Sequence, residues 1–161
     1  MLFRKLFCLL VLLSFLREIK AQTPLPMARN LLVAYKNQTR TTDGKPGKNY
    51  WQNTANYDLK INFDPVTRLL IGTASIDYFN NSPDTLTQVL FKLYPNLYKR
   101  SSPRLMNIDS ADLTNGVSIE QFSINGDPAK PEQRRVNGTN MTVTIPALSP
   151  GQQMRFTINY S

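Results

Sequence analysis

The stretch YDLKINFDPVTRLLIGTASIDYFN, residues 57–80, decides the fold. Every second residue of its first half is apolar: Tyr57, Leu59, Ile61 and Phe63. This period of two predicts a half-buried antiparallel strand. Residues 64–67 (DPVT) suit a type I turn, and residues 69–80 are rich in β-branched and aromatic side chains that favour a second strand. The stretch therefore predicts a β-hairpin, in which Gly72 marks a bulge or a close approach to the backbone.

The rest of the chain repeats this alternation of strands and turns. Residues 86–93 predict a strand with Val89, Phe91 and Leu93 facing the core; a helix over residues 86–94 is the alternative, but Pro95 would stop it. Further strands are predicted at residues 117–124, 141–145 and 154–160, with a bulge near Glu120. Asn-Gly pairs at residues 125–126 and 137–138 predict hairpin turns.

Six or more strands without a convincing long amphipathic helix predict an all-β fold, either an antiparallel β-sandwich or a saddle-like curved sheet. The sequence stops at Ser161 directly after a predicted strand. We therefore expect a fold that is incomplete at its C-terminus.

Residues 1–21 predict a signal peptide. Arg4 and Lys5 precede an apolar run at residues 6–15, which is short for a membrane span, and the expected cut lies between Ala21 and Gln22. A retained N-terminal anchor is the alternative. Export to the periplasm or the extracellular space follows, with no membrane span after cleavage. Residues 22–49 are then a leader or linker, with a short helix or first strand at residues 31–35, and residues 50–161 form the β-domain.

Charge gives little support for a nucleic-acid partner. The formal charge of +8 falls to +5 without residues 1–21, and the surplus is spread along the chain, as on a solvated surface. One basic and aromatic cluster is similar to platforms that bind single-stranded nucleic acid. Its members are Lys92, Tyr94, Tyr98, Lys99, Arg100 and Arg104. We favour the interpretation that the two tyrosines pack at a sheet edge while the charges stay in water.

Composition also excludes several classes of enzyme. The chain has no histidine and its one cysteine, Cys8, lies in the predicted signal peptide. Zinc sites of the HExxH kind, Ser-His-Asp systems and thiol catalysis are therefore ruled out. No catalytic or metal-binding residue is predicted. Four carboxylates could in principle form a glycosidase pair or a calcium site, but their spacing favours solvated loops. They are Asp77, Asp109, Asp112 and Glu120.

Aromatic residues at the start of the β-domain allow two interpretations. Trp51, beside Tyr50 and Tyr57, could form a platform on which a sugar stacks. An aromatic anchor in the core is the interpretation that we favour, because large aromatic side chains contribute most when they are buried.

The strand pattern resembles a known family. Tyr50-Trp51-Gln52 and the segment from residue 57 to 98 are similar to the N-terminal β-domain of exported bacterial zinc metallopeptidases of the aminopeptidase N type. The matching positions are Gly72, Ile76, Tyr78, Asn80, Ser82, Leu86, Leu90, Phe91, Leu93, Tyr94 and Asn96. The later strands and turns follow the same order, so that the resemblance covers residues 50–161.

The resemblance implies a non-catalytic part of a larger enzyme. In that family an HExxH segment with a distant glutamate holds zinc, and a GAMEN-type strand holds the amino terminus of a peptide substrate. Neither motif occurs here, so no catalytic or zinc-binding residue can be assigned and the chain itself needs no cofactor. The implied partner is a downstream catalytic domain. The alternative is a free-standing exported β-sandwich that binds glycans or proteins.

Overall fold

The computed structural model describes residues 27–161. The predicted signal peptide and its cleavage point between Ala21 and Gln22 lie outside these residues. The chain divides into two units at the bond between Tyr50 and Trp51. The described part of the first unit has one helix, α2 (Arg29–Lys36), so the apolar patch at residues 31–35 is helical and not extended. None of the described helices is long and apolar enough to cross a membrane.

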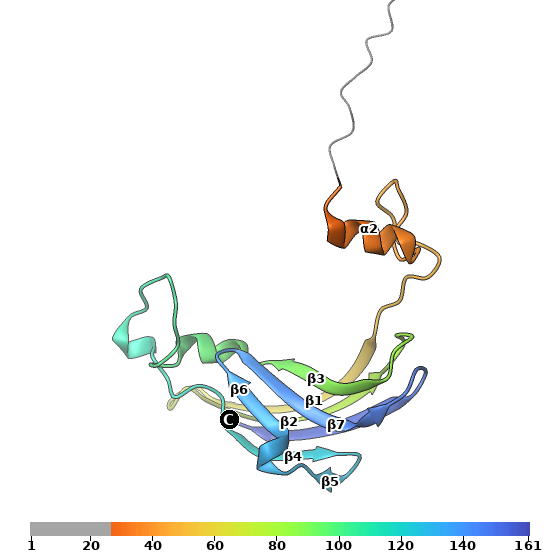
Figure 1. Cartoon of the computed structure of the whole chain (residues 1–161). Helices are drawn as coiled ribbons and strands as arrows, with labels where there is room; N and C mark the ends of the chain where they lie inside the picture. The colour runs from red at the N-terminus through yellow and green to blue at the C-terminus, as the bar shows by residue number, and fades with distance from the viewer. Residues whose placement is uncertain (1–26) are drawn as a thin grey trace, which may run out of the picture. The chain divides into compact units, whose positions relative to one another are not determined.

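The second unit consists of two antiparallel sheets (Figure 1). The five-stranded sheet has the order β1-β2-β8-β4-β5, with β1 at Thr54–Asp64, β2 at Leu69–Phe79, β8 at Gln153–Tyr160, β4 at Ile119–Ile124 and β5 at Asp127–Pro128. The three-stranded sheet has the order β3-β7-β6, with β3 at Leu86–Lys92, β7 at Asn140–Leu148 and β6 at Arg134–Asn137. Short 3₁₀ helices lie at Tyr94–Tyr98 (η1), Ser110–Asp112 (η2) and Pro131–Gln133 (η3). The prediction of an all-β sandwich is confirmed.

The hairpin of residues 57–80 forms as predicted. β1 and β2 pair along their whole length, from Thr54 opposite Phe79 to Asp64 opposite Leu69. Asp64 closes the turn, because its carboxylate accepts hydrogen bonds from the Val66 backbone N–H at 2.9 Å and from the Thr67 hydroxyl at 2.7 Å. These two donors hold the pKa of Asp64 below its usual value, with the hydroxyl as the larger cause.

Two further local predictions are confirmed in the five-stranded sheet. The pairing of β4 with β8 shifts register between Ile119 and Gln121, which is the expected irregularity at Glu120. Asn125 and Gly126 both have positive φ, at 53° and 93°, and connect β4 to β5. This pair of left-handed residues is what a tight hairpin turn needs.

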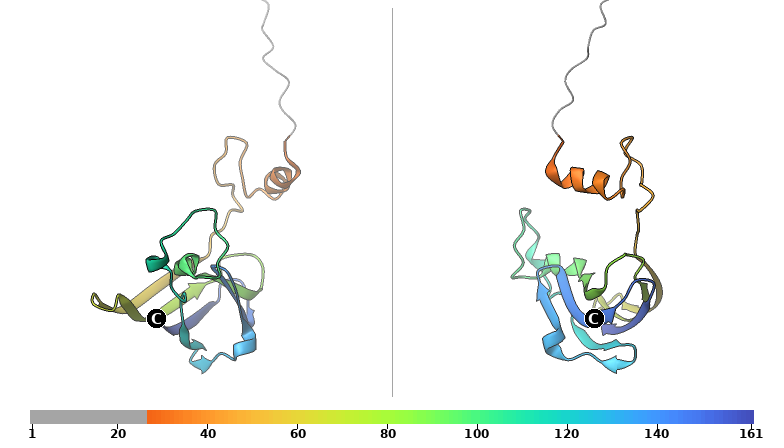
Figure 2. Two further views of the ribbon diagram at one scale, coloured as in Figure 1. Left: turned by 90° about the vertical axis from the view of Figure 1, so that its left-hand side faces the viewer. Right: turned by 45° about the vertical axis from the view of Figure 1, so that its right-hand side comes forward.

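The core lies between the two sheets, which Figure 2 shows as layers. Met141 and Val143 of β7 face Phe156 of β8, and all three side chains are at most 1% exposed. Phe91 of β3 contacts Phe122 and Phe156 edge to face, with ring centres 5.6 and 5.2 Å apart. β3 therefore lies over β4 and β8, with its core face as predicted.

One prediction about the hairpin is wrong. The apolar side of β1 was expected to be half-buried, but Tyr57, Leu59, Ile61 and Phe63 are 51–65% exposed. The register places these side chains on the same face as Ala74 and Ile76 of β2, which is the face that carries the core. They remain exposed because the smaller sheet has only three strands and does not extend over β1.

Candidate functional site

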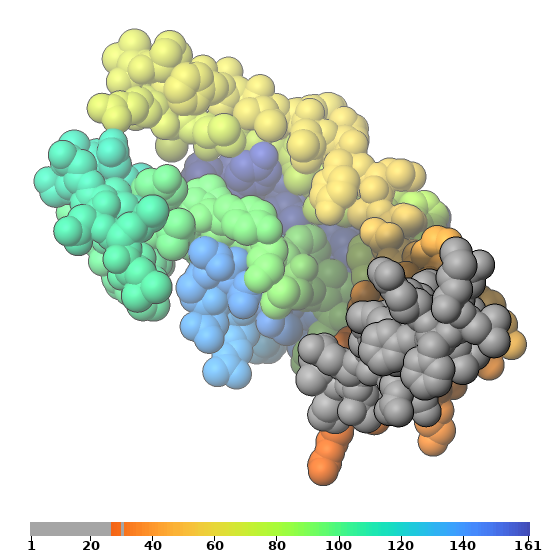
Figure 3. Space-filling view, turned by 90° about the horizontal axis from the view of Figure 1, so that it is seen from above, coloured from red at the N-terminus to blue at the C-terminus, as the bar shows by residue number. Residues whose placement is uncertain are grey.

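An apolar groove remains where the two sheets separate. We call it the open groove: a depression of about 470 Å³ bounded by the inner face of β1, β2 and β8 on one side and by β3 and η1 on the other. Tyr57, Ile76 and Ile158 line its floor, and Phe91 and Leu93 line the opposite wall. In the space-filling view of Figure 3, β8 is visible between the β1–β2 hairpin and the segment of β3 and η1.

The open groove is lined mainly by apolar and aromatic side chains. Its polar groups lie at the side chains of Tyr57, Tyr94, Tyr160 and Lys92, and none of its lining residues is acidic. The ammonium of Lys92 donates a hydrogen bond to Asn140 Oδ1. Such walls can bury apolar side chains of a partner, and they offer tyrosine hydroxyls as hydrogen-bond groups around them.

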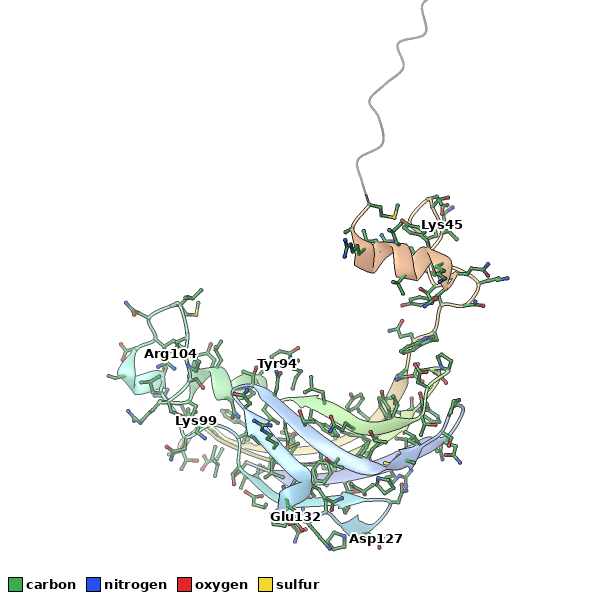
Figure 4. The ribbon with its side chains drawn as sticks, in the orientation of Figure 1. Lys45, Tyr94, Lys99, Arg104, Asp127 and Glu132 are labelled. Carbon is green, nitrogen blue, oxygen red and sulfur yellow. The ribbon has the colours of Figure 1, made fainter. Side chains whose placement is uncertain are left out.

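Two aromatic members of the basic and aromatic cluster, Tyr94 and Tyr98, line one shallow depression on η1. Tyr94 and Tyr98 are 72% and 46% exposed, so the expectation that they pack at a sheet edge is wrong for Tyr94. Arg104 donates to the carbonyl oxygens of Leu97 and Lys99 at 3.3 and 2.9 Å, and it thereby holds its own loop (Figure 4). That guanidinium has a structural role.

The four candidate carboxylates have separate structural partners. Asp77 forms a bidentate ion pair with Arg155, in which Nε and Nη2 donate to the two carboxylate oxygens at 2.6 and 2.7 Å. This pair holds the pKa of Asp77 below its usual value. Asp109 accepts from the backbone N–H of Ala111 at 2.9 Å and caps η2. The remaining contacts are Asp112 with Arg68 at 3.9 Å and Glu120 with the Ser161 hydroxyl at 2.7 Å.

None of these contacts joins two of the four carboxylates to each other. Within residues 27–161, no three histidine, cysteine, aspartate or glutamate side chains come together as metal ligands would. The zinc site that belongs to the resembled family does not fit this chain, because its two histidine ligands are absent from the sequence.

Trp51 does not anchor the core. Its side chain is 42% exposed, and it is not among the buried residues of the sandwich. Tyr57, 65% exposed, lines the open groove, whereas Tyr50 belongs to the other unit. The core-anchor interpretation is therefore wrong, and Trp51 is available to a ligand.

Several positions of the family-like pattern are buried polar residues that hold turns. Asn80 is fully buried, and its amide donates to the carbonyl oxygens of Asp84 and Leu148 at 2.8 and 2.9 Å. Ser82, 2% exposed, donates its hydroxyl proton to Asn80 Oδ1 at 2.6 Å. These bonds fix the crossing from β2 to β3.

Asn96 has the same kind of role at the other end of β3. It is 3% exposed; its amide donates to the Gly138 carbonyl at 3.0 Å, and its side-chain oxygen accepts from the Val117 backbone N–H at 2.7 Å. Asn96 thereby ties η1 to the turn between β6 and β7 and to the segment that leads into β4. In the sequence these asparagines stand out only as parts of the family-like pattern. The signal for their structural role is a polar residue at the end of a strand, next to a turn.

The chain was compared with known proteins. No protein-family model matches it, and neither the curated proteins nor the solved structures contain a match.

Proposed function

We propose that the β-unit is a non-catalytic packing module, equivalent to the N-terminal domain of an exported zinc aminopeptidase, and that its open groove receives a catalytic domain. The observation that carries the proposal is the uncovered apolar face of β1. An exposed apolar strip of this length on a water-soluble domain indicates a surface that another protein covers. The resemblance over residues 50–161 supports the choice of partner.

The first experiment is genetic. The reading frame through Ser161, or an adjacent gene, is expected to encode an HExxH segment followed by a distant glutamate. Absence of both would contradict the proposal. The zinc-bound water of that partner would carry out the peptide hydrolysis, and residues of this chain would only help to enclose the cavity.

The second experiment uses two neighbouring leucines of β2 that face opposite ways. Leu70 lies opposite Phe63 on the groove side, whereas Leu69 lies opposite Asp64 on the outer side; they are 41% and 47% exposed. In the protein joined to its catalytic domain, Leu70→Lys is expected to speed proteolytic release of the β-unit. Leu69→Lys is the matched control and should leave the rate unchanged. Equal rates for both variants would argue against packing through the groove.

Export is part of the same proposal. Residues 1–21 would be removed, so that the mature chain begins at Gln22. N-terminal sequencing of the protein recovered from the periplasm or medium tests this directly. A protein that retains Met1 and stays with the membrane fraction would support the anchor alternative.

A second candidate function is glycan binding, and the exposure of Trp51 favours it. An exposed indole can stack on the apolar face of a sugar ring. Binding of soluble polysaccharides to the full chain, lost in Trp51→Ala while the circular dichroism spectrum is unchanged, would support this function. Unchanged binding in the variant, or none in the parent chain, would exclude Trp51 as the platform.

A further inference from the structure

The outer edge of β1 has no pairing strand within the described residues. β1 is the first strand of the five-stranded sheet, and among residues 27–161 only β2 pairs with it. It is eleven residues long, with no proline and no break in its register. A long, regular edge strand of this kind offers a row of backbone N–H and C=O groups to another strand.

The two faces of β1 differ in character. The groove-side face is apolar, whereas the outer face carries Asn56, Asp58, Lys60 and Asn62, all exposed. Asp58 lies opposite Ser75 of β2, and Lys60 lies opposite Thr73, so neither charge has an ionic partner across that pair. Within the described part of the chain, no salt bridge involves either residue.

We propose that the chain forms a twofold dimer in which β1 pairs antiparallel with β1 of a second copy, with the axis at Leu59. Two residues that lie directly opposite each other in an antiparallel pair have their side chains on the same face of the sheet. A twofold axis makes each contact between two different residues occur twice. In this register Asp58 faces Lys60 of the second copy, and Lys60 faces its Asp58. The β1 strand thus supplies its own ionic partners.

The same register also pairs polar residues with polar residues and apolar residues with apolar residues along β1. On the outer face, Asn56 meets Asn62 of the second copy. On the groove-side face, Tyr57 meets Ile61, and Leu59 meets its own equivalent. Because Leu59 is the midpoint of Thr54–Asp64, all eleven residues pair and none overhangs. Apolar and opposite-charge cross-strand pairs each stabilise a sheet.

Neighbouring registers are disfavoured by charge. An axis at Asp58 would place that carboxylate opposite Asp58 of the second copy. An axis at Lys60 would place two ammonium groups opposite each other. An axis at Ile61 would set Asp58 against Asp64. Like charges directly opposite each other destabilise a sheet. The axis at Leu59 combines two ionic pairs with the pairing of all eleven residues, whereas an axis nearer either end of β1 leaves residues unpaired.

The assembly closes at two copies. The other edge of the five-stranded sheet is β5, which has only two residues and includes Pro128. Such an edge cannot add a strand in the way that β1 can. The pairing also lies in the plane of the sheet, so that the open groove remains accessible to the partner domain proposed above.

Charge reversal tests both the dimer and its register. The full chain is expected to sediment as a dimer in analytical ultracentrifugation. Asp58→Lys and Lys60→Glu each place two like-charge contacts in the interface, and each should raise the dimer dissociation constant by at least about tenfold. The double variant Asp58→Lys with Lys60→Glu should restore dimerisation.

Mixing the two single variants provides the sharpest readout. One chain then carries two positive charges and the other two negative charges, so a heterodimer has both ionic contacts while neither homodimer has any. Recovery of dimer on mixing is expected. Arg135→Glu, on β6 of the other sheet, is the matched control and should not change the dissociation constant. A monomeric parent chain, or single variants that dimerise as well as the parent, would overturn the proposal.

Discussion

The aromatic ring of Tyr160 lies directly over the backbone of Gly72, the residue opposite it in the neighbouring strand. A Cβ atom placed on Gly72 would lie 2.7 Å from the ring, closer than van der Waals contact allows. The presence of Gly72 within the strand predicted such a close approach to the backbone. Because Gly72 has no side chain, the ring of Tyr160 can approach the backbone of β2 at the end of β8, where it also borders the open groove.

Replacing Gly72 should therefore destabilise the sandwich through a clash. Gly72→Ala is expected to lower the free energy of unfolding by about 1–3 kcal/mol, as overpacking in a core does. Urea denaturation measures the change. In a Tyr160→Ala background the same substitution should cost much less, because the ring that it meets is gone. Additive effects of the two substitutions would contradict the contact.

The buried amide of Asn80 offers a second test. Asn80→Ala removes donors to the carbonyl oxygens of Asp84 and Leu148 and leaves these groups without their bonds. We expect a loss of about 2–4 kcal/mol, since buried polar groups that lose their partners are costly. Asn107→Ala, at an exposed loop position, is the control and should change the midpoint of urea denaturation little. A similarly small change for Asn80→Ala would show that the crossing from β2 to β3 does not depend on this amide.

Sequence patterns predicted the parts of the fold that depend on nearby residues. The alternation in residues 57–63, the Asn125-Gly126 turn and the shift of register at Glu120 each follow from local geometry, and each is present. A period of two identifies which side of a strand is apolar. It does so without reference to any other segment.

What lies opposite an apolar face could not be predicted in this way. The side chains of Tyr57 and Leu59 carry the same signal as those of Met154 and Phe156, yet the first two are exposed and the last two are buried. The difference arises because β3 lies over β4 and β8 and not over β1. Trp51 shows the same limit: its size favours burial, but it precedes β1 at the uncovered edge of the sheet.

The ion pair between Asp77 and Arg155 predicts a dependence of stability on pH. The guanidinium holds the folded-state pKa of Asp77 below the unfolded value, which is about 3.9. The pair therefore stabilises the fold at pH values above that unfolded pKa, and its contribution is lost as the pH falls through the lower, folded pKa.

Asp77→Asn should remove this contribution. Compared with the parent chain, the variant is expected to have a lower melting temperature at pH 6–7 and a flatter decline of melting temperature in acid. Added salt should reduce the difference at neutral pH, because both side chains reach solvent. Parallel melting curves for parent and variant from neutral pH into acid would show that the pair does not contribute.

The phenylalanine contacts across the sandwich can be tested by substitution, with the neighbouring residue of β3 as the control. Phe91 of β3 contacts Phe122 and Phe156 of the other sheet, whereas its neighbour Leu90 is 50% exposed at the border of the open groove and is not part of the buried core. Phe91→Ala is expected to cost about 2–4 kcal/mol, from lost burial and the cavity left behind, and Leu90→Ala less than about 1 kcal/mol. Because Phe91 also forms a wall of the open groove, its loss should widen the groove and increase binding of a hydrophobic dye to the folded protein. Equal stability losses for the two variants, with no change in dye binding, would mean that β3 does not hold the two sheets together at this point.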